Sequence, residues 1–290
     1  MTVVMSRPAA VVALTFGLAL AVAPPVGAQR APSSTYEVYA VRFGGYRAYP
    51  TYELVAGADT TRRQELAFIV LVMKNGHGRN VLFDAGFYRP QFVDKWKPFD
   101  FVMPSLAIAK VGLKPDDVTD VVISHVHWDH LDGADLFPKA NVWIQRDEYN
   151  HYVDSAGMPA DRGIDTADAA MLLSLKRSGR LKLIDGDNKQ FLLGITAYTG
   201  GRHTYASQFL GVKTRGGLVI LASDNVYLYE NLDKHRPIHA TFTPEDSTSN
   251  LKAQERMEQL AASSALIIPG HDPQIFVRFP KPGDGVALIK

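Results

Sequence analysis

The sequence predicts a mixed α/β domain in which two β-sheets pack face to face and helices cover the outer faces. Each half of the chain has short segments rich in Val, Ile, Phe and Tyr, typical of strands, and then segments with helical spacing. This order in both halves favours a four-layer αββα sandwich. The 290 residues are 46% hydrophobic and 21% charged, a composition typical of a globular domain with a substantial core.

The individual elements follow from local signals. Asn75-Gly76-His77-Gly78 is a turn signal between two strand-like segments, which predicts a hairpin. Gly112 is expected to end a short helix. The predicted strands are residues 36–43, 66–73, 80–84, 120–124, 141–145, 181–184, 191–198, 207–212, 217–223 and 265–268, and the predicted helices are residues 105–110, 146–153, 166–177 and 247–262.

Charge and cysteine content exclude several classes of function. Lys and Arg number 31 against 30 Asp and Glu, and this balance argues against a nucleic-acid partner, which needs a concentrated basic surface. The chain has no cysteine, so disulfides, iron–sulfur clusters, thiolate nucleophiles and Cys-ligated zinc are excluded. Any bound metal ion is therefore expected to have His, Asp or Glu ligands.

The N-terminal segment has the pattern of a secretory signal peptide. Arg7 precedes an apolar run over residues 9–23, and small residues end at Ala28. The apolar run is shorter than the ~20 residues that span a bilayer. We therefore expect a signal peptide over residues 1–28, a mature domain over residues 29–290, a periplasmic or secreted location, and no stable membrane insertion after cleavage.

The most informative motif lies directly after a predicted buried strand. Residues 124–130 read Ser-His-Val-His-Trp-Asp-His, with His125, His127, Asp129 and His130 within six positions. Imidazole and carboxylate groups in this density are typical of metal ligands. Without a metal, several adjacent histidines would repel one another when protonated.

Three further candidate ligands follow other predicted strands. His203 lies in a Gly-Gly-Arg-His-Thr segment, Asp224 ends the apolar run that begins at Gly217, and His271 follows Pro-Gly near the C-terminus. Each one alone is compatible with a polar surface loop. Together they supply enough ligands for a second metal ion.

These four motifs, in this order and spacing, resemble those of the metallo-β-lactamase-fold hydrolases over nearly all of the mature chain. The resemblance implies an αββα sandwich and two divalent metal ions, with zinc expected and iron, manganese or cobalt also compatible with the ligands. It implies that His125, His127 and His203 hold one ion, that Asp129, His130 and His271 hold the second, and that Asp224 bridges both.

Within this superfamily, the chain is most similar to the N-acyl-homoserine lactone lactonases. Members of that subfamily carry a D-x-x-Y-x-x-E-N pattern that begins at the bridging Asp, and residues 224–231 read Asp-Asn-Val-Tyr-Leu-Tyr-Glu-Asn. Many class B β-lactamases instead use a Cys ligand, and others lack the bridging Asp. The export signal is a departure from the cytoplasmic lactonases of the subfamily.

The resemblance implies that a metal-bridging hydroxide opens the lactone ring of N-acyl-homoserine lactones, the reaction called quorum quenching. Tyr227 is expected to hydrogen-bond the substrate carbonyl and stabilise the oxyanion, although a buried core tyrosine is the alternative. Asp129 is expected to pass a proton to the leaving alkoxide. Trp128 and Phe87 are expected to contact the acyl chain, although an aromatic segment packed on the body of the protein is the alternative for Phe87.

Other functions remain compatible with the same residues. A β-lactamase-like amidase and an organophosphate or aryl-ester hydrolase would use the same metal ligands, so the motifs do not separate them from a lactonase. An exported metal-binding or scaffold protein is the alternative outside the enzymes. The expected partner is a small-molecule lactone or ester substrate.

Overall fold

The computed structural model describes residues 1–3, 5 and 35–290. Contacts between Cα atoms divide the chain into residues 1–31 and a compact unit over residues 32–290. The predicted signal peptide lies almost wholly outside the described residues and stays a prediction. In the part of the chain that the structure describes, no helix is both long enough and apolar enough to cross a bilayer.

Two β-sheets form the centre of the compact unit. The larger sheet has seven strands in the order β12-β1-β2-β3-β4-β5-β6, and the smaller has five in the order β11-β10-β9-β8-β7. The strands of the larger sheet are β1 (Glu37–Pro50), β2 (Arg63–Lys74), β3 (Asn80–Phe83), β4 (Asp120–Val122), β5 (Asn141–Gln145), β6 (Leu181–Ile184) and β12 (Val286–Leu288). Those of the smaller sheet are β7 (Lys189–Leu192), β8 (Ile195–Thr199), β9 (Gln208–Thr214), β10 (Gly217–Ser223) and β11 (Ile267–Pro269).

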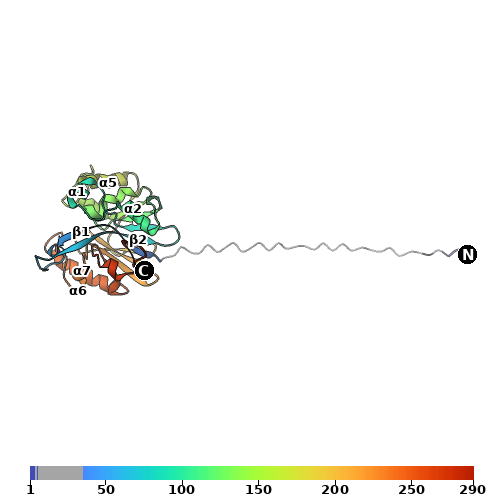
Figure 1. Cartoon of the computed structure of the whole chain (residues 1–290). Coiled ribbons are helices and arrows are strands. Elements are labelled where there is room, and N and C mark those ends of the chain that lie inside the picture. The colour runs from blue at the N-terminus through green and yellow to red at the C-terminus, as the bar shows by residue number, and fades with distance from the viewer. Residues whose placement is uncertain (4, 6–34) are drawn as a thin grey trace. The chain divides into compact units, whose positions relative to one another are not determined.

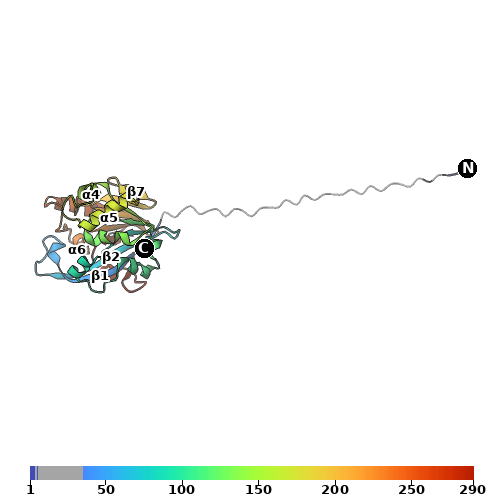
Figure 2. The ribbon, with the colours of Figure 1, turned by 90° about the horizontal axis from the view of Figure 1, so that it is seen from above.

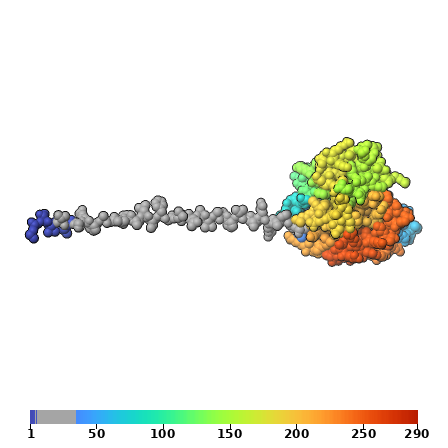
Figure 3. Space-filling view, turned by 180° about the vertical axis from the view of Figure 1, so that it is seen from behind, coloured from blue at the N-terminus to red at the C-terminus, as the bar shows by residue number. Residues whose placement is uncertain are grey.

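Helices cover both outer faces. Figure 1 shows α1, α2 and α5 on one side of the sheets and α6 and α7 on the other, and in Figure 2 β1 and β2 run side by side. The segments around α5 and α7 also occupy opposite sides of the surface in Figure 3. The helices are α1 (Pro90–Trp96), α2 (Pro104–Ala107), α3 (Trp128–Leu131), α4 (Arg146–Tyr152), α5 (Thr166–Arg177), α6 (Tyr229–Asp233), α7 (Asp246–Leu260) and α8 (Ile275–Arg278). Short 3₁₀ turns are η1 (Thr51–Glu53), η2 (Ile108–Val111), η3 (Pro115–Asp117), η4 (Asp132–Leu136) and η5 (Ser264–Leu266).

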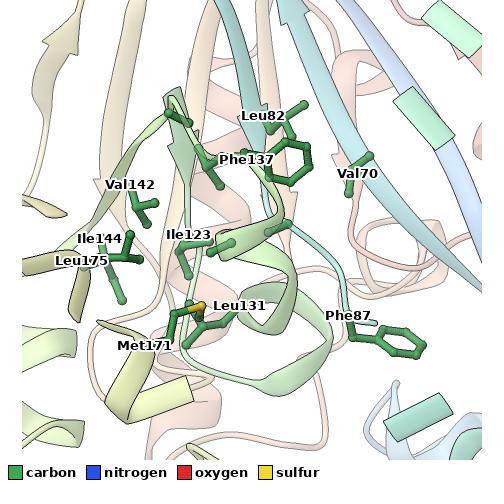
Figure 4. Close-up of a cluster of buried hydrophobic side chains, with 14 of the residues drawn as sticks. Val70, Leu82, Phe87, Ile123, Leu131, Phe137, Val142, Ile144, Met171 and Leu175 are labelled. Atoms are coloured by element: carbon green, nitrogen blue, oxygen red, sulfur yellow. The ribbon is translucent and has the colours of Figure 1, made fainter. Parts of the chain in front are cut away.

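Alternation along the strands creates three apolar layers between four layers of secondary structure. In β4 and its continuation, Val121 and Ile123 face the helices of the first half, whereas Val122 faces the second sheet. Side chains on one face of the larger sheet pack with Leu131, Phe137 and the residues of α5 (Figure 4). A second cluster lies between the sheets, and a third packs the smaller sheet against Met257 and its neighbours on α7. The αββα sandwich predicted from the sequence is therefore confirmed.

Most predicted elements are present, and the differences have local causes. The predicted strand 191–198 is wrong as a single strand, because the chain turns at Gly194 (φ 82°) and β7 pairs antiparallel with β8. Gly112 ends a helical turn as expected, with φ 74°. The sequence prediction did not include α1 or β12. The first begins at Pro90 inside an aromatic segment, and the second is only three residues long.

We expect Phe137→Ala to destabilise the domain by about 3–5 kcal/mol, because it leaves a large cavity in the apolar layer between the larger sheet and its helices. Phe137 is 0% exposed. Urea denaturation should show a lower midpoint with an unchanged slope. The matched control is Leu106→Ala on α2, where the side chain is 61% exposed and a change within about 0.5 kcal/mol is expected. Equal losses in the two variants would contradict the described packing.

Candidate metal centre

The seven predicted ligands lie together at one edge of the sandwich, although they come from both sheets. His125 and His127 lie in the loop after β4, and Asp129 and His130 lie on α3, which follows it directly. The other three side chains come from the smaller sheet: His203 from the β8–β9 loop, Asp224 from the end of β10 and His271 from the segment after β11. This arrangement follows the general tendency of α/β folds to place sites at the carboxyl ends of strands.

The ligand atoms form two groups that share one carboxylate. The first group contains His125, His127, His203 and Asp224, and the second contains Asp129, His130 and His271. In the first group, His127 Nδ1 lies 3.0 Å from His125 Nε2 and 2.9 Å from His203 Nε2, and Asp224 Oδ2 lies 3.7 and 3.5 Å from the same two Nε2 atoms. Tetrahedral Zn–N bonds of about 2.0–2.1 Å would place ligand atoms about 3.3 Å apart, so these spacings suit a zinc ion.

The other oxygen of Asp224 faces the second group. Asp224 Oδ1 lies 3.3 Å from His130 Nε2 and 3.1 Å from His271 Nε2. Asp129 Oδ2 lies 3.6 Å from each of these two nitrogen atoms. One carboxylate therefore reaches both groups, which is the geometry of a bridging ligand.

Two buried polar atoms at the second group have no hydrogen-bond partner among the described residues and would be satisfied by a cation. Within residues 35–290, His130 Nε2 and Asp224 Oδ1 are buried without a hydrogen bond of acceptable geometry. A buried polar group without a partner costs about 1–3 kcal/mol. A divalent cation between them would satisfy both atoms, and imidazole and carboxylate are ordinary zinc ligands. The residues present therefore fit a pair of metal ions.

Hydrogen bonds on the far side of three imidazoles fix which nitrogen points into the centre. His203 Nδ1 donates to the Ala240 carbonyl at 2.7 Å, and His271 Nδ1 donates to the Ala67 carbonyl at 3.1 Å. His130 Nδ1 lies 2.9 Å from Asp84 Oδ2. Such bonds leave Nε2 as the acceptor atom that a metal ion requires.

The two groups differ in charge state. Burial, and then the neighbouring imidazoles, lower the pKa of His125 and His127 well below the usual value, so both are neutral ligands. Burial also opposes charge on His130, but the negative charges of Asp224 and Asp129 outweigh it and raise the pKa of His130 well above the usual value. Burial disfavours the Asp224 carboxylate, yet His130 and His271 hold its pKa well below the usual range. The negative charges of Asp224 and Asp129 therefore favour positive charge at the second group, which a bound cation would also supply.

The backbone around the shared carboxylate is adapted to close packing. Ser223 has φ 48°, an unusual left-handed conformation for a non-glycine residue, immediately before Asp224. A Cβ on Gly270 would lie 2.6 Å from Asp224 Oδ1, so only glycine leaves room there. Asp84, with φ 64°, accepts from the Ser124 N–H at 2.7 Å and the Ser124 hydroxyl at 2.9 Å. Strain of this kind is common where the structure fixes a functional group.

A pocket of about 240 Å³ opens onto both groups of ligands. Its polar side is formed by ligand residues, and its opposite side is largely aromatic and aliphatic. Trp128 lines the pocket, and Tyr227 lines it with its ring between one histidine of each group. The ring centroid of Tyr227 lies 5.6 Å from that of His203 and 5.9 Å from that of His271. The full lining is Tyr49, Leu54, Leu66, Phe68, Trp96, His127, Trp128, Asp129, His203, Asp224, Tyr227, Ala240 and His271.

Phe87 does not line this pocket, which corrects its predicted role. Its side chain is 0% exposed and packs edge-on against Trp128, with 4.6 Å between the ring centroids. Trp96, from the same aromatic segment, lines the pocket instead and stacks on Trp128 at 5.2 Å. Phe87 therefore supports Trp128 from behind, because the chain turns at Gly86 (φ 68°) and directs Phe87 into the core.

Two structural features of the pocket had no distinct sequence signal. Tyr49, at the end of β1, lines the pocket, and burial, then Glu53 and then Asp129, raise its pKa to about 12. The start of α1 is held by Asp132, whose Oδ2 accepts from the backbone N–H of Tyr88 and of Arg89 at 2.7 and 3.0 Å. These contacts position the helix that carries Trp96.

Comparison with known proteins agrees with this geometry. A family model described as the metallo-beta-lactamase superfamily matches residues 61–271. The chain belongs to the metallo-beta-lactamase superfamily. This membership confirms the expected fold and places the chain in a family of hydrolases.

Several relatives within the metallo-beta-lactamase superfamily are lactonases. The chain is 29% identical over 197 residues to an N-acyl homoserine lactonase of Bacillus cereus. The match covers 68% of this chain and 71% of the relative. It is 27% identical over 185 residues to an N-acyl homoserine lactonase of Agrobacterium fabrum. That match covers 61% of this chain and 65% of the relative. A crystal structure of a quorum-quenching N-acyl homoserine lactone lactonase matches with a TM-score of 0.68 and 21% identity, covering 84% of this chain and 95% of that one. A dizinc quorum-quenching lactonase with bound product matches with a TM-score of 0.62 and 14% identity, covering 87% and 90%.

We expect the protein to bind two zinc ions per chain, and His271→Ala to reduce this to about one, because it removes a ligand of the second group only. Asp224→Ala should weaken both ions, since its two oxygens face different groups. Zinc content after dialysis, measured by mass spectrometry, tests both expectations. His77→Ala, in the exposed β2–β3 turn, is the matched control and should retain two ions. Retention of two tightly held ions by Asp224→Ala would rule out a shared ligand.

Proposed function

We propose that this protein is a dinuclear metal-dependent hydrolase that opens the lactone ring of N-acyl-homoserine lactones. The observation that carries the proposal is the carboxylate of Asp224 between two histidine groups, at the floor of a pocket with one polar and one apolar side. An N-acyl-homoserine lactone has the same division, with a polar ester ring and an apolar acyl chain. The lactonase relatives at 27–29% identity support this substrate class.

The proposed cofactors are two divalent ions, with zinc as the expected metal. His125, His127 and His203 would hold one ion, Asp129, His130 and His271 the other, and Asp224 would contact both. When bound, such a pair lowers the pKa of a shared water toward neutrality and polarises the ester carbonyl.

Tyr227 is proposed to bind the substrate carbonyl oxygen. Burial, and then the negative charges of Asp224 and Asp129, raise the pKa of Tyr227 well above the usual value, so the phenol keeps its proton and acts as a donor. The ring is only 9% exposed and lies between His203 and His271, so the hydroxyl is confined to the floor of the pocket. A fixed donor of this kind stabilises the negative charge that develops on the oxygen as the carbonyl is attacked.

Asp129 is proposed to carry the proton that ring opening requires. Its Oδ2 faces His130 and His271, which leaves Oδ1 as the oxygen that can hold a proton. Asp129 also lines the pocket, within reach of a substrate. Asp129 would accept the proton that the attacking water loses and pass it to the leaving alkoxide, so that the elements of one water add across the ester bond and the N-acyl-homoserine forms.

The aromatic side of the pocket is proposed to bind the acyl chain. Trp128 and Trp96 stack with an interplanar angle of 20°, and Phe92 stacks on Trp128 at 4.9 Å. The stack gives a rigid apolar wall next to the metal ligands. With the signal peptide proposed for residues 1–28, the enzyme would act on lactones in the periplasm or outside the cell.

The substrate class is tested by a turnover panel on zinc-loaded protein. We expect hydrolysis of N-acyl-homoserine lactones, measured by the acid released, with a kcat/KM at least tenfold above those for nitrocefin and paraoxon. The apolar wall and the donor at Tyr227 suit a neutral ester with an acyl chain better than a charged β-lactam or a phosphotriester. Absence of lactone hydrolysis would refute the proposed substrate, and preferred turnover of nitrocefin or paraoxon would replace it with an amidase or organophosphate hydrolase.

We expect Tyr227→Phe to reduce kcat for lactones by about 10²-fold, because it removes one hydrogen-bond donor to the developing oxyanion. Steady-state kinetics and zinc content should be measured together, and zinc content should not change. The matched control is Tyr229→Phe. This neighbouring tyrosine is also buried, but it is not among the residues that line the pocket, so kcat should be unaffected. Equal kcat values for wild type and Tyr227→Phe would remove this residue from the mechanism.

A further inference from the structure

One buried carboxylate lies outside the two groups of ligands and is not used in the proposed reaction. Glu148, the third residue of α4, is 0% exposed. Its Oε1 accepts hydrogen bonds from the Val126 N–H at 3.1 Å and from the Thr204 hydroxyl at 2.6 Å. Its Oε2 accepts one from the Ala206 N–H at 2.6 Å. All three partners are donors, so the site requires a group that only accepts.

These three donors belong to the two loops that carry every histidine of the first group. Val126 lies between His125 and His127, in the loop that follows β4 of the larger sheet. Thr204 directly follows His203, and Ala206 follows two residues later, in the loop between β8 and β9 of the smaller sheet. One side chain on a third element, α4, therefore joins two loops from different sheets.

The carboxylate is held in a place that is unfavourable for a charge. Burial raises the pKa of Glu148 to about 7, against the opposing effect of the hydrogen bonds from Thr204, Ala206 and Val126. A buried charge is costly unless hydrogen bonds compensate it. The neighbouring Tyr149 and Tyr152 already supply buried apolar surface to α4, so packing of the helix does not explain an acid at this position.

A different carboxylate, Asp84, contacts the second group, so the contacts of Glu148 concern the first group alone. Asp84 contacts His130 Nδ1 directly at 2.9 Å. Glu148 instead accepts hydrogen bonds from backbone and hydroxyl groups that flank the histidines. The contacts of Glu148 therefore bear on the distance between the loop after β4 and the β8–β9 loop.

We infer that Glu148 is a positioning residue that sets the separation of His125 and His127 from His203, and thereby the affinity of the first group for zinc. The inference rests on the metal centre of the proposed function. Residues that orient metal ligands typically change metal affinity by about 10–100-fold when they are replaced. We expect an effect of this size, restricted to one of the two ions.

The main test is Glu148→Gln, in which the shape of the side chain is kept but one oxygen becomes a donor. Whichever way the amide lies, an N–H group then faces the N–H of Ala206 or the donors Val126 and Thr204. Zinc-loaded protein is titrated with a chromophoric zinc chelator, and the release of each ion is followed by absorbance. We expect one of two ions to leave at a chelator concentration about 10–100-fold lower than in wild type.

Two reference variants show which ion has been lost. His203→Ala removes a ligand of the first group, and His271→Ala removes a ligand of the second. The ion that Glu148→Gln retains should match the ion retained by His203→Ala in its chelator profile. Glu258→Gln, the same chemical change on an exposed position of α7, is the matched control and should release zinc as wild type does.

Thr204 provides a second test if Glu148→Gln does not fold. Thr204→Val keeps the shape of the side chain but removes the hydroxyl donor to Oε1, and it should weaken the same ion. Thr204→Ser restores the donor and should restore the wild-type profile. Rescue by serine separates the hydrogen bond from a general effect of changing a residue beside His203.

Three results would overturn the inference. These are unchanged release of both ions from Glu148→Gln or Thr204→Val, release of both ions together, and loss of the ion that His203→Ala retains. Wild-type protein that binds no zinc would overturn the proposed metal centre and this inference with it. Zinc binding without lactone hydrolysis would count against the proposed substrate alone, because the chelator titration does not depend on turnover.

Discussion

The candidate metal centre depends on the carboxylate of Asp224. Its Oδ2 faces His125 and His203, and its Oδ1 faces His130 and His271. Five histidines in a buried cluster would otherwise repel one another whenever they carry protons. The negative charge of Asp224 offsets this repulsion, and two divalent ions held by the same atoms would do so more completely. The close approach of Gly270 and the left-handed backbone at Ser223 both follow from placing this carboxylate between two groups.

The sandwich supplies what a single sheet could not, namely two sets of strand ends at one edge. Packing of the apolar layer between the sheets brings the end of β4 next to those of β8, β10 and β11. Polar contacts close this edge: the Gln208 N–H donates to the Ser124 carbonyl at 2.9 Å, and Gln208 Nε2 donates to the Ile123 carbonyl at 2.7 Å. Together with Glu148 and Asp84, these bonds tie the loops of the centre to rigid elements. Rigid support of this kind is what keeps metal ligands in their positions.

The pocket combines a polar floor with a wall whose position is fixed from behind. Trp128 belongs to the metal-binding motif in sequence but lies in the aromatic wall, so the motif links the two sides of the pocket. Phe87 packs behind Trp128, and Asp132 holds the start of the helix that carries Trp96. The wall is therefore built from residues with the same rigid support as the ligands, which suits a substrate whose ester must lie at a fixed point.

The sequence by itself determined the fold class, the identity of the seven clustered side chains and the neighbourhood of Tyr227 and Trp128. The fold class, the ligands and Trp128 follow from local chemistry, because strand periodicity, turn residues and ligand-rich motifs are written in contiguous residues. The place of Tyr227 was instead implied by the resemblance to the lactonases. It did not separate β7 from β8, because a two-residue turn at Gly194 interrupts an otherwise continuous apolar segment. Only the tertiary structure decided that Phe87 is buried, that Tyr49 and Trp96 line the pocket, and that Glu148 joins two loops. Each of these depends on contacts between residues far apart in the chain, and such contacts are set by how the two sheets and their helices pack, which no short stretch of sequence specifies.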